Sequence, residues 1–188
     1  CLQGNHEAGL VGDLDEEWFN DAAWGALEWT RKKLTHADRE QIAKWRPTGQ
    51  HEGIQLAHGS LNPDAAFDYL LTPRALKAHF AAQAAPLCFV GHTHVPEIWT
   101  EGREDPVAWP KSGPYTLEPR RKTVINVGSV GLPRGGDKRA TWATYDPMKG
   151  AVTLRRTDYD VQEVIRTIKH LRHDSIIEAK LLRDLGQG

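Results

Sequence analysis

Leu87-Cys88-Phe89-Val90-Gly91-His92-Thr93-His94 joins a run of four apolar residues to a short loop that carries two histidines. A continuous apolar run of this length predicts a strand that is covered on both faces of its sheet. Ile54-Gln55-Leu56-Ala57 predicts a second short strand, and His58 follows it directly. Because ligands bind at the carboxyl ends of strands in open α/β sheets, we expect the two histidine loops to meet at one edge.

The segments around these two strands predict a layered α/β fold. Helical patterns are expected at 13–34, at 35–46, at 72–85 and in two amphipathic stretches after residue 160. Further strands are expected at 123–127 and, as a hairpin, at 141–145 and 151–156. The segment 101–119 is rich in Gly, Pro and charge and predicts a long loop or an irregular hairpin. Trp109 in this loop, together with Trp99, either covers the substrate as a lid or packs into the core.

The composition is that of an ordinary soluble globular protein, with 188 residues, 39% hydrophobic and 26% charged, and a net charge of −1. This charge balance provides no basic field for nucleic acid. No apolar run reaches the roughly 20 residues that a membrane helix needs. We therefore expect a single domain over 1–188 in the cytoplasm, acting on a small molecule, with its oligomeric state undetermined. Cys88 lies in an apolar run and is expected to be a buried free thiol.

Nine histidines are present, and four of them occupy short segments that contain glycine, which lets a loop bend tightly. One such histidine alone is better explained by a structural role. Four in three loops favour metal binding, because imidazole is the commonest metal ligand in proteins. These four are His6, His58, His92 and His94. The others lie in charge-rich helical or loop stretches and are interpreted as surface residues: His36, His51, His79, His170 and His173.

The candidate ligands also indicate the kind of metal. Imidazole nitrogens together with the amide oxygen of Asn5 suit borderline first-row ions rather than a thiolate-held structural zinc. An amide oxygen is a weak ligand, which fits a site with exchangeable positions for water and substrate. Two ions about 3.5–4 Å apart would need a bridging carboxylate. No Asp or Glu in these motifs is an obvious bridge, and Glu7 is expected to point away from the site.

The motifs together resemble those of the calcineurin-like metallophosphoesterases, in particular the small bacterial and archaeal phosphodiesterase branch. Gly4-Asn5-His6-Glu7 is similar to their GNH[ED] motif, His58 to their single-histidine motif, and Gly91-His92-Thr93-His94 to their GHxH motif. The stretch 126–134, Asn-Val-Gly-Ser-Val-Gly-Leu-Pro-Arg, resembles their NxGSVGxPR segment. The resemblance covers essentially the whole chain. It implies a layered α/β/β/α sandwich with mixed central sheets and a phosphodiesterase or phosphatase activity.

The resemblance also implies a role for each motif residue. Asn5, His58 and His92 would hold one divalent ion, and His94 would hold a second, the ions being Mn, Fe, Zn or Ni. Water activated by the two ions would attack phosphorus in line. His6 would bind no metal and would protonate the leaving oxygen as a general acid. Asn5 and His6 would therefore also contact the substrate.

Arg134 would bind the substrate phosphate or form a salt bridge. The family has two earlier motifs, DxH and GDxx[DN], and neither occurs in this sequence. They would supply the bridging Asp, most ligands of the second ion and the first strands of the sheet. We therefore expect the 188 residues to be the C-terminal part of a longer enzyme, missing its N-terminal strands and inactive alone. Two alternatives stay open: a non-catalytic protein-binding scaffold on the same fold, and a domain with one structural zinc.

Overall fold

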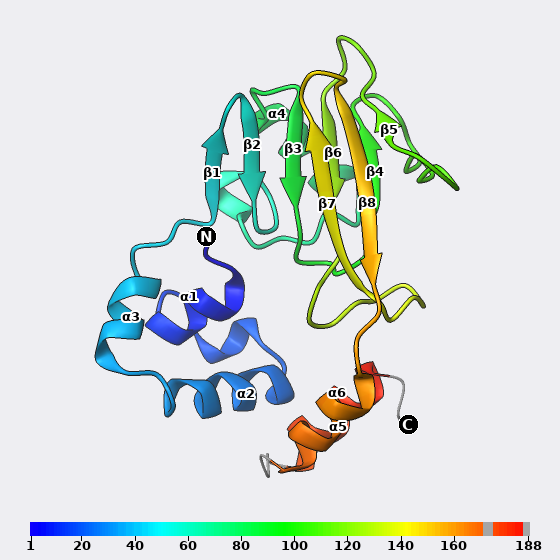
Figure 1. Cartoon of the computed structure of the whole chain (residues 1–188). Coiled ribbons are helices and arrows are strands. Elements are labelled where there is room, and N and C mark those ends of the chain that lie inside the picture. Colours follow the sequence, from blue (N-terminus) through cyan, green and yellow to red (C-terminus); the bar gives the residue numbers. More distant parts are fainter. Residues whose placement is uncertain (171–174, 186–188) are drawn as a thin grey trace. The chain divides into compact units, whose positions relative to one another are not determined.

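The computed structural model describes residues 1–170 and 175–185, and the chain forms two compact units (Figure 1). Unit 1 consists of Cys1, Gln3–Arg46 and the described residues from Tyr159 onward. Unit 2 consists of Leu2 and Pro47–Asp158. The position of one unit relative to the other is not determined, so each is described by itself. The single domain expected over 1–188 stays a prediction.

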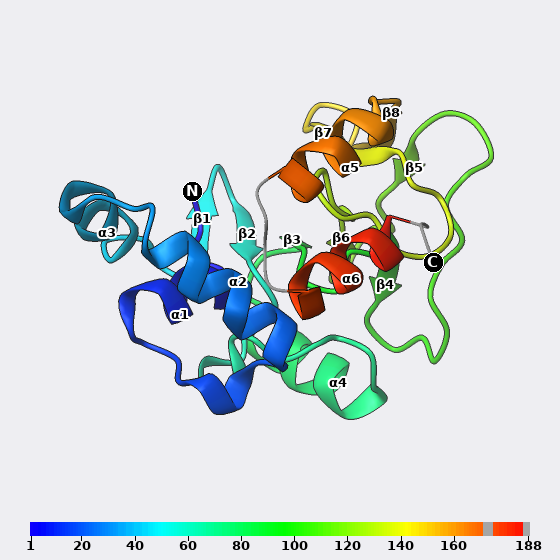
Figure 2. The same ribbon diagram turned by 90° about the horizontal axis from the view of Figure 1, so that it is seen from below.

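Unit 2 is built on two β-sheets, with helix α4 (Pro73–Ala82) on one side of the larger sheet and the smaller sheet on the other (Figure 2). The larger sheet has the strand order β1-β2-β3-β6-β4. Its strands are β1 (Thr48–His51), β2 (Ile54–Ala57), β3 (Leu87–Val90), β4 (Glu97–Thr100) and β6 (Thr123–Asn126). The smaller sheet, in the order β5-β8-β7, comprises β5 (Tyr115–Thr116), β7 (Ala140–Asp146) and β8 (Ala151–Thr157). A 3₁₀ turn, η2 (Pro63–Ala65), precedes α4.

The three central strands of the larger sheet run in parallel. Gln55 of β2 lies opposite Cys88 of β3, and Cys88 lies opposite Val124 of β6. Strands β1 and β4 pair antiparallel with β2 and β6 at the two edges. The mixed sheet confirms the predicted α/β class. Because parallel strands end at the same edge, the loops that follow Ala57, Val90 and Asn126 are brought together there (Figure 1).

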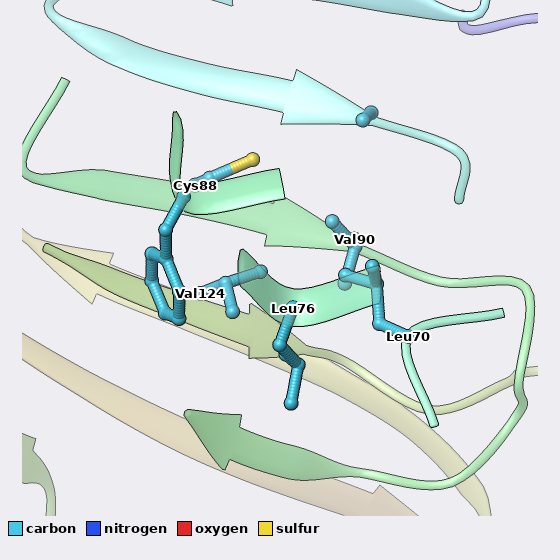
Figure 3. Packing of buried hydrophobic residues seen from close by; sticks show 7 residues of the cluster. Leu70, Leu76, Cys88, Val90 and Val124 are labelled. Carbon is cyan, nitrogen blue, oxygen red and sulfur yellow. The ribbon is translucent and has the colours of Figure 1, made fainter. Parts of the chain in front are cut away.

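One hydrophobic cluster fills the space between the larger sheet and α4 (Figure 3). Leu76 and Phe80 come from α4, and Cys88, Val90 and Val124 come from the sheet. Cys88 is fully buried as a free thiol, as its sequence context predicted. Burial raises the pKa of this thiol to about 12, so it has little thiolate character and is a core residue rather than a nucleophile.

A second cluster packs between the two sheets. Leu87, Ile98 and Ile125 face it from the larger sheet, and Tyr115 and Val152 face it from the smaller one. The tryptophans whose role the sequence left open both pack against core clusters: Trp109 against this one and Trp99 against the cluster beside α4. This agrees with the core interpretation of the two side chains rather than with a lid.

Unit 1 is helical and comprises α1 (Asn5–Val11), η1 (Glu16–Trp18), α2 (Asp21–Arg31), α3 (His36–Ile42), α5 (Val161–His170) and α6 (Ser175–Asp184). The helix expected at 35–46 is present as α3 and begins with a capping box, since Thr35 Oγ1 accepts the Asp38 N–H and the Asp38 carboxylate accepts the Thr35 N–H. The single helix expected over 13–34 is wrong at its start. Helix α2 begins only after Asn20, whose side chain accepts the N–H of Ala23, and a 3₁₀ turn precedes it.

Three edge strands were not predicted: β1, β4 and the two-residue β5, which lies in the segment expected to be a long loop or an irregular hairpin. Strand β1 has no alternating apolar pattern and is held by its antiparallel register with β2 across the turn at Glu52-Gly53. His51 therefore lies in a strand, not in the loop expected from the sequence. Strand β4 follows Pro96 and pairs with β6. Within the described ranges, none of the helices combines the length and the apolar character that crossing a membrane requires.

Candidate metal centre

Two of the predicted ligands converge in unit 2. His58 directly follows β2, and its carbonyl oxygen accepts the N–H of Gly91 at 2.9 Å, which ties the two histidine loops together. His58 Nε2 then lies 3.1 Å from His92 Nδ1. The ring centroids are 4.8 Å apart. The sequence prediction that these loops meet at the carboxyl ends of β2 and β3 is therefore confirmed for these two side chains.

The separation of the two nitrogens suits a pair of ligands on one ion. Two nitrogens about 2.0–2.1 Å from the same Zn²⁺ lie about 3.3 Å apart at a tetrahedral angle and about 2.9 Å apart at a right angle. The distance between His58 Nε2 and His92 Nδ1, 3.1 Å, lies between these values. Without an ion, one of the two nitrogens carries the hydrogen and donates it to the other. The donor pair therefore fits a divalent ion, whose binding stays a prediction.

His94 is oriented by a different contact. Its Nδ1 lies 2.8 Å from the carbonyl oxygen of Leu132. A carbonyl oxygen can only accept, so Nδ1 carries the hydrogen and Nε2 keeps the lone pair that a metal requires. His94 does not join His58 and His92: in the part of the chain that the structure describes, no three His, Cys, Asp or Glu side chains are grouped closely enough to hold one ion.

Both histidines of the second loop adopt an unusual backbone conformation. His92 has φ 65° and His94 has φ 63°, which is the left-handed region. A residue with a β-carbon is disfavoured there by about 1–2 kcal/mol. Between them, Thr93 is buried, and its N–H donates to the Gly91 carbonyl at 2.7 Å. Such conformations persist only where the surrounding structure holds them, and they cluster at functional sites.

Asn126 is the residue that holds this loop. It ends β6 and is 4% exposed. Its Nδ2 donates to the Gly91 carbonyl and to Thr93 Oγ1, and its Oδ1 accepts the N–H of Gly128 at 2.9 Å. Both ends of the amide are therefore used, on two loops at once. Sequence reasoning missed this role, although an Asn at the carboxyl end of a buried strand is a signal that could have pointed to it.

Arg134 lies beside the same loop. Its backbone N–H donates to the His94 carbonyl at 3.1 Å, and the residue is exposed to solvent. Among the described residues, no carboxylate pairs with its guanidinium, which argues against the salt bridge that was the alternative. Its contact with a substrate phosphate stays a prediction.

Asn5 and His6 lie in unit 1, and their local structure differs from the loop expected for them. They are the first two residues of helix α1. The Glu7 carboxylate accepts the N–H of Gly4 at 2.9 Å, which satisfies a free donor at the helix start. The ring of His6 packs edge-on against Phe19, with centroids 5.6 Å apart. His6 is exposed as a whole, but the burial of its ring lowers its pKa. The negative charge of Glu7 acts in the opposite direction and raises the pKa by a smaller amount.

The predicted site therefore has two parts. Unit 1 carries Asn5 and His6, and unit 2 carries His58, His92 and His94. The convergence of the amide and the general acid with the three imidazoles stays a prediction.

Comparisons with known proteins bear on the fold and the superfamily of the chain. No family model matches the chain. Over 175 residues it is 27% identical to the uncharacterized protein MJ0912 of Methanocaldococcus jannaschii, which covers 89% of this chain and 69% of that protein. A metallophosphoesterase from Sphaerobacter thermophilus superposes with a TM-score of 0.80 and 27% identity, covering 96% of this chain and 75% of that one. This chain belongs to the calcineurin-like metallophosphoesterase superfamily.

The hypothetical protein PH1004 of Pyrococcus horikoshii shares the metallophosphoesterase fold with this chain at a TM-score of 0.67 and 20% identity, over 96% of this chain and 71% of that one. The fold class and the superfamily predicted from the motifs are therefore both correct. The superfamily motifs do not account for two further residues near the histidine loops, Tyr69 and His79.

Tyr69 lies in the loop between η2 and α4. Its ring stacks on the imidazole of His92, with centroids 4.2 Å apart and an angle of 9° between the planes. Tyr69 is nevertheless 45% exposed. Nothing in the sequence pattern around Tyr69 indicates this contact, because it joins residues of two loops that are separated by strand β3 and helix α4.

His79 was predicted to be a surface residue, and that prediction is wrong. It lies on the buried face of α4 with Leu76 and Phe80, is fully buried, and its Nδ1 accepts the N–H of Leu61 at 3.2 Å. Burial lowers its pKa to about 4, with a smaller opposing effect of Gln83. His36, His51 and His170 are exposed as predicted, and His173 lies outside the described residues.

Proposed function

We propose that this protein is a divalent-metal-dependent hydrolase of small phosphoesters. The observation that carries the proposal is the approach of His58 Nε2 to His92 Nδ1, 3.1 Å, at the carboxyl ends of two parallel strands. Membership of the superfamily supports it, and so does the similarity to a protein named a metallophosphoesterase. The order of the motifs along the chain, with Gly4-Asn5-His6-Glu7 first, His58 second and Gly91-His92-Thr93-His94 third, also agrees with the proposal.

In this proposal, Asn5, His58 and His92 hold one ion and His94 holds the other. Their imidazole nitrogens and amide oxygen suit Mn, Fe, Zn or Ni. When bound, the ions would supply charge stabilisation of the phosphoryl oxygens and activation of a water molecule. The hydrogen bond from His94 Nδ1 to Leu132 fixes the tautomer in which Nε2 is the ligand atom.

The remaining roles belong to side chains around the phosphoester. His6 donates a proton to the leaving oxygen, the general-acid role that imidazole most often takes in enzymes. Asn5 and His6 orient the substrate, and the Arg134 guanidinium binds its phosphate. Glu7 is not a ligand in this proposal, because its carboxylate already accepts the Gly4 N–H.

The experiment measures hydrolysis of a chromogenic phosphodiester with added Mn²⁺ by the complete gene product, including any residues that precede Cys1. His92→Ala should weaken Mn²⁺ binding and abolish most of the rate. His6→Ala should lower kcat by about 10²–10⁴-fold, the usual contribution of a general acid, while leaving Mn²⁺ binding intact. His36→Ala is the matched control, because His36 is an exposed histidine of α3 that takes no part in the proposed site.

Two results would contradict the proposal. Unchanged rates in both His6→Ala and His92→Ala would remove the roles assigned to these residues. Wild-type protein that binds Mn²⁺ and hydrolyses neither phosphodiesters nor phosphomonoesters would favour the scaffold alternative, and a single tightly held Zn²⁺ without hydrolysis would favour a structural zinc domain.

A further inference from the structure

The ring plane of His92 is not fixed by its own torsions. The χ2 torsion of histidine has a broad, roughly two-fold potential, so the imidazole can rotate about the Cβ–Cγ bond at little cost. Asn126 holds the backbone of the loop, but it contacts Gly91 and Thr93 rather than the imidazole. The direction of the Nδ1 lone pair therefore depends on what touches the His92 ring.

Tyr69 covers one face of that ring. The two planes are nearly parallel, at 9°, and the centroids are 4.2 Å apart, so the rings are stacked in close contact. On the nitrogen side, His58 Nε2 approaches Nδ1 at 3.1 Å. Rotation of the His92 imidazole about χ2 would break the stack and would turn Nδ1 away from His58.

Tyr69 is itself held in place by its neighbours in the chain. Leu70 is buried in the core cluster beside α4, and the N–H of Leu71 donates to the Tyr69 carbonyl at 2.9 Å, which makes a tight turn. Tyr69 is 45% exposed, so burial of its side chain contributes little free energy to folding. Its stack on His92 is the contact that distinguishes Tyr69 from an ordinary surface residue.

We infer that Tyr69 is a positioning residue of the metal centre: by stacking on His92, it fixes the imidazole plane in which Nδ1 faces the same ion as His58 Nε2. This inference rests on the proposed function. It assigns the role to the ring of Tyr69 and none to its hydroxyl.

The first measurement tests the stack in the metal-free protein by NMR of the histidine ring protons. In the wild type, the ring current of Tyr69 should shift the His92 imidazole protons upfield. Tyr69→Phe should keep this shift, because it keeps the ring, and Tyr69→Leu should lose it. Leu71→Ala is the matched control, because Leu71 is 60% exposed in the same loop and should leave the shift unchanged.

The second measurement is Co²⁺ affinity of the complete gene product, together with the visible absorption of the bound ion, which reports its ligand geometry. Tyr69→Leu should bind Co²⁺ about 3- to 10-fold more weakly, from the usual worth of an aromatic pair, and should change the spectrum. Tyr69→Phe and Leu71→Ala should match the wild type in both. Recovery by Phe separates positioning by the ring from a general loss of folding, which circular dichroism of each variant also checks.

The outcomes are distinguishable. A wild-type protein that binds no Co²⁺, Zn²⁺ or Mn²⁺ overturns the proposed function, and this inference with it, whatever the NMR shows. A wild type that binds Co²⁺ while Tyr69→Leu binds it equally well, with an unchanged spectrum, overturns the inference alone. A His92 resonance that does not move between wild type and Tyr69→Leu does the same, because it removes the stack from which the inference starts.

Discussion

Acidification should destabilise this protein through His79, a buried residue outside the candidate metal centre. His79 is fully buried, and its Nδ1 accepts the N–H of Leu61, so the neutral ring is the form that the folded protein holds. Protonation would place a charge in the core and would replace the acceptor at Nδ1 with a second donor facing Leu61.

The magnitude follows from the pKa of His79, about 4 in the folded protein against an ordinary 6.5. Because the pKa is lower in the folded state, the unfolded chain binds more protons between these two values, so stability is intact above pH 6.5 and falls as the pH drops toward 4. At 1.36 kcal/mol per unit, the whole difference amounts to about 3 kcal/mol, of which about 2 kcal/mol is lost by pH 5.

Urea unfolding followed by tryptophan fluorescence at pH 7, 6 and 5, in EDTA, measures this loss. His79→Asn places an amide oxygen near the position of Nδ1 and cannot titrate. It should lower stability at pH 7 but should remove about 2 kcal/mol from the difference between pH 7 and pH 5. His36→Asn, at an exposed position of α3, should leave the difference as in the wild type. Parallel pH profiles for wild type and His79→Asn would refute the reasoning.

The other predictions concern the support of the histidine loop. Asn126→Asp removes both amide donors, so it should weaken Co²⁺ binding by about 10- to 100-fold, as measured by titration, with wild-type affinity as the contradicting result. Gly128→Ala would place a β-carbon 2.0 Å from Thr141 Oγ1 at φ +80°, whereas Gly136→Ala at φ +95° meets nothing within 4 Å. Urea unfolding should show Gly128→Ala about 2 kcal/mol less stable than Gly136→Ala, and equal values would show that the clash is relieved.

The elements that could be predicted from the sequence have a local signal. Strand β3 is a continuous apolar run, and α4 begins with Thr72 as N-cap and Pro73 as first helical residue, with Thr72 accepting the N–H of Ala75. Strand β1 was missed because its signal is not local. Thr48–His51 alternates no apolar residues and becomes a strand only through its pairing with β2.

The candidate site divides in the same way. His58, His92 and His94 could be found because histidines in glycine-containing loops after strands are visible in the sequence, and the parallel order of β2 and β3 then brings the first two together. Tyr69 and His79 could not be placed, because their partners are distant in the chain. His79 in particular shares its helix with charged residues, and only the folded structure, in which its Nδ1 accepts the N–H of Leu61, shows that it is buried.

The backbone of the histidine loop gives an argument for function that does not depend on similarity. His92 and His94 take the left-handed conformation, which costs a residue with a β-carbon about 1–2 kcal/mol and costs glycine nothing. Gly91, next to them, does not have a positive φ, and a β-carbon there would meet the His58 carbonyl oxygen only at an ordinary 3.7 Å. A loop shaped for stability alone would place its glycine in the strained positions and a larger residue at 91. In this loop the histidines occupy the strained positions and the glycine an unstrained one. The hydrogen bonds from Asn126 to Gly91 and Thr93 hold the backbone in this conformation. This is the arrangement expected if the two imidazoles serve the proposed metal centre rather than the stability of the fold.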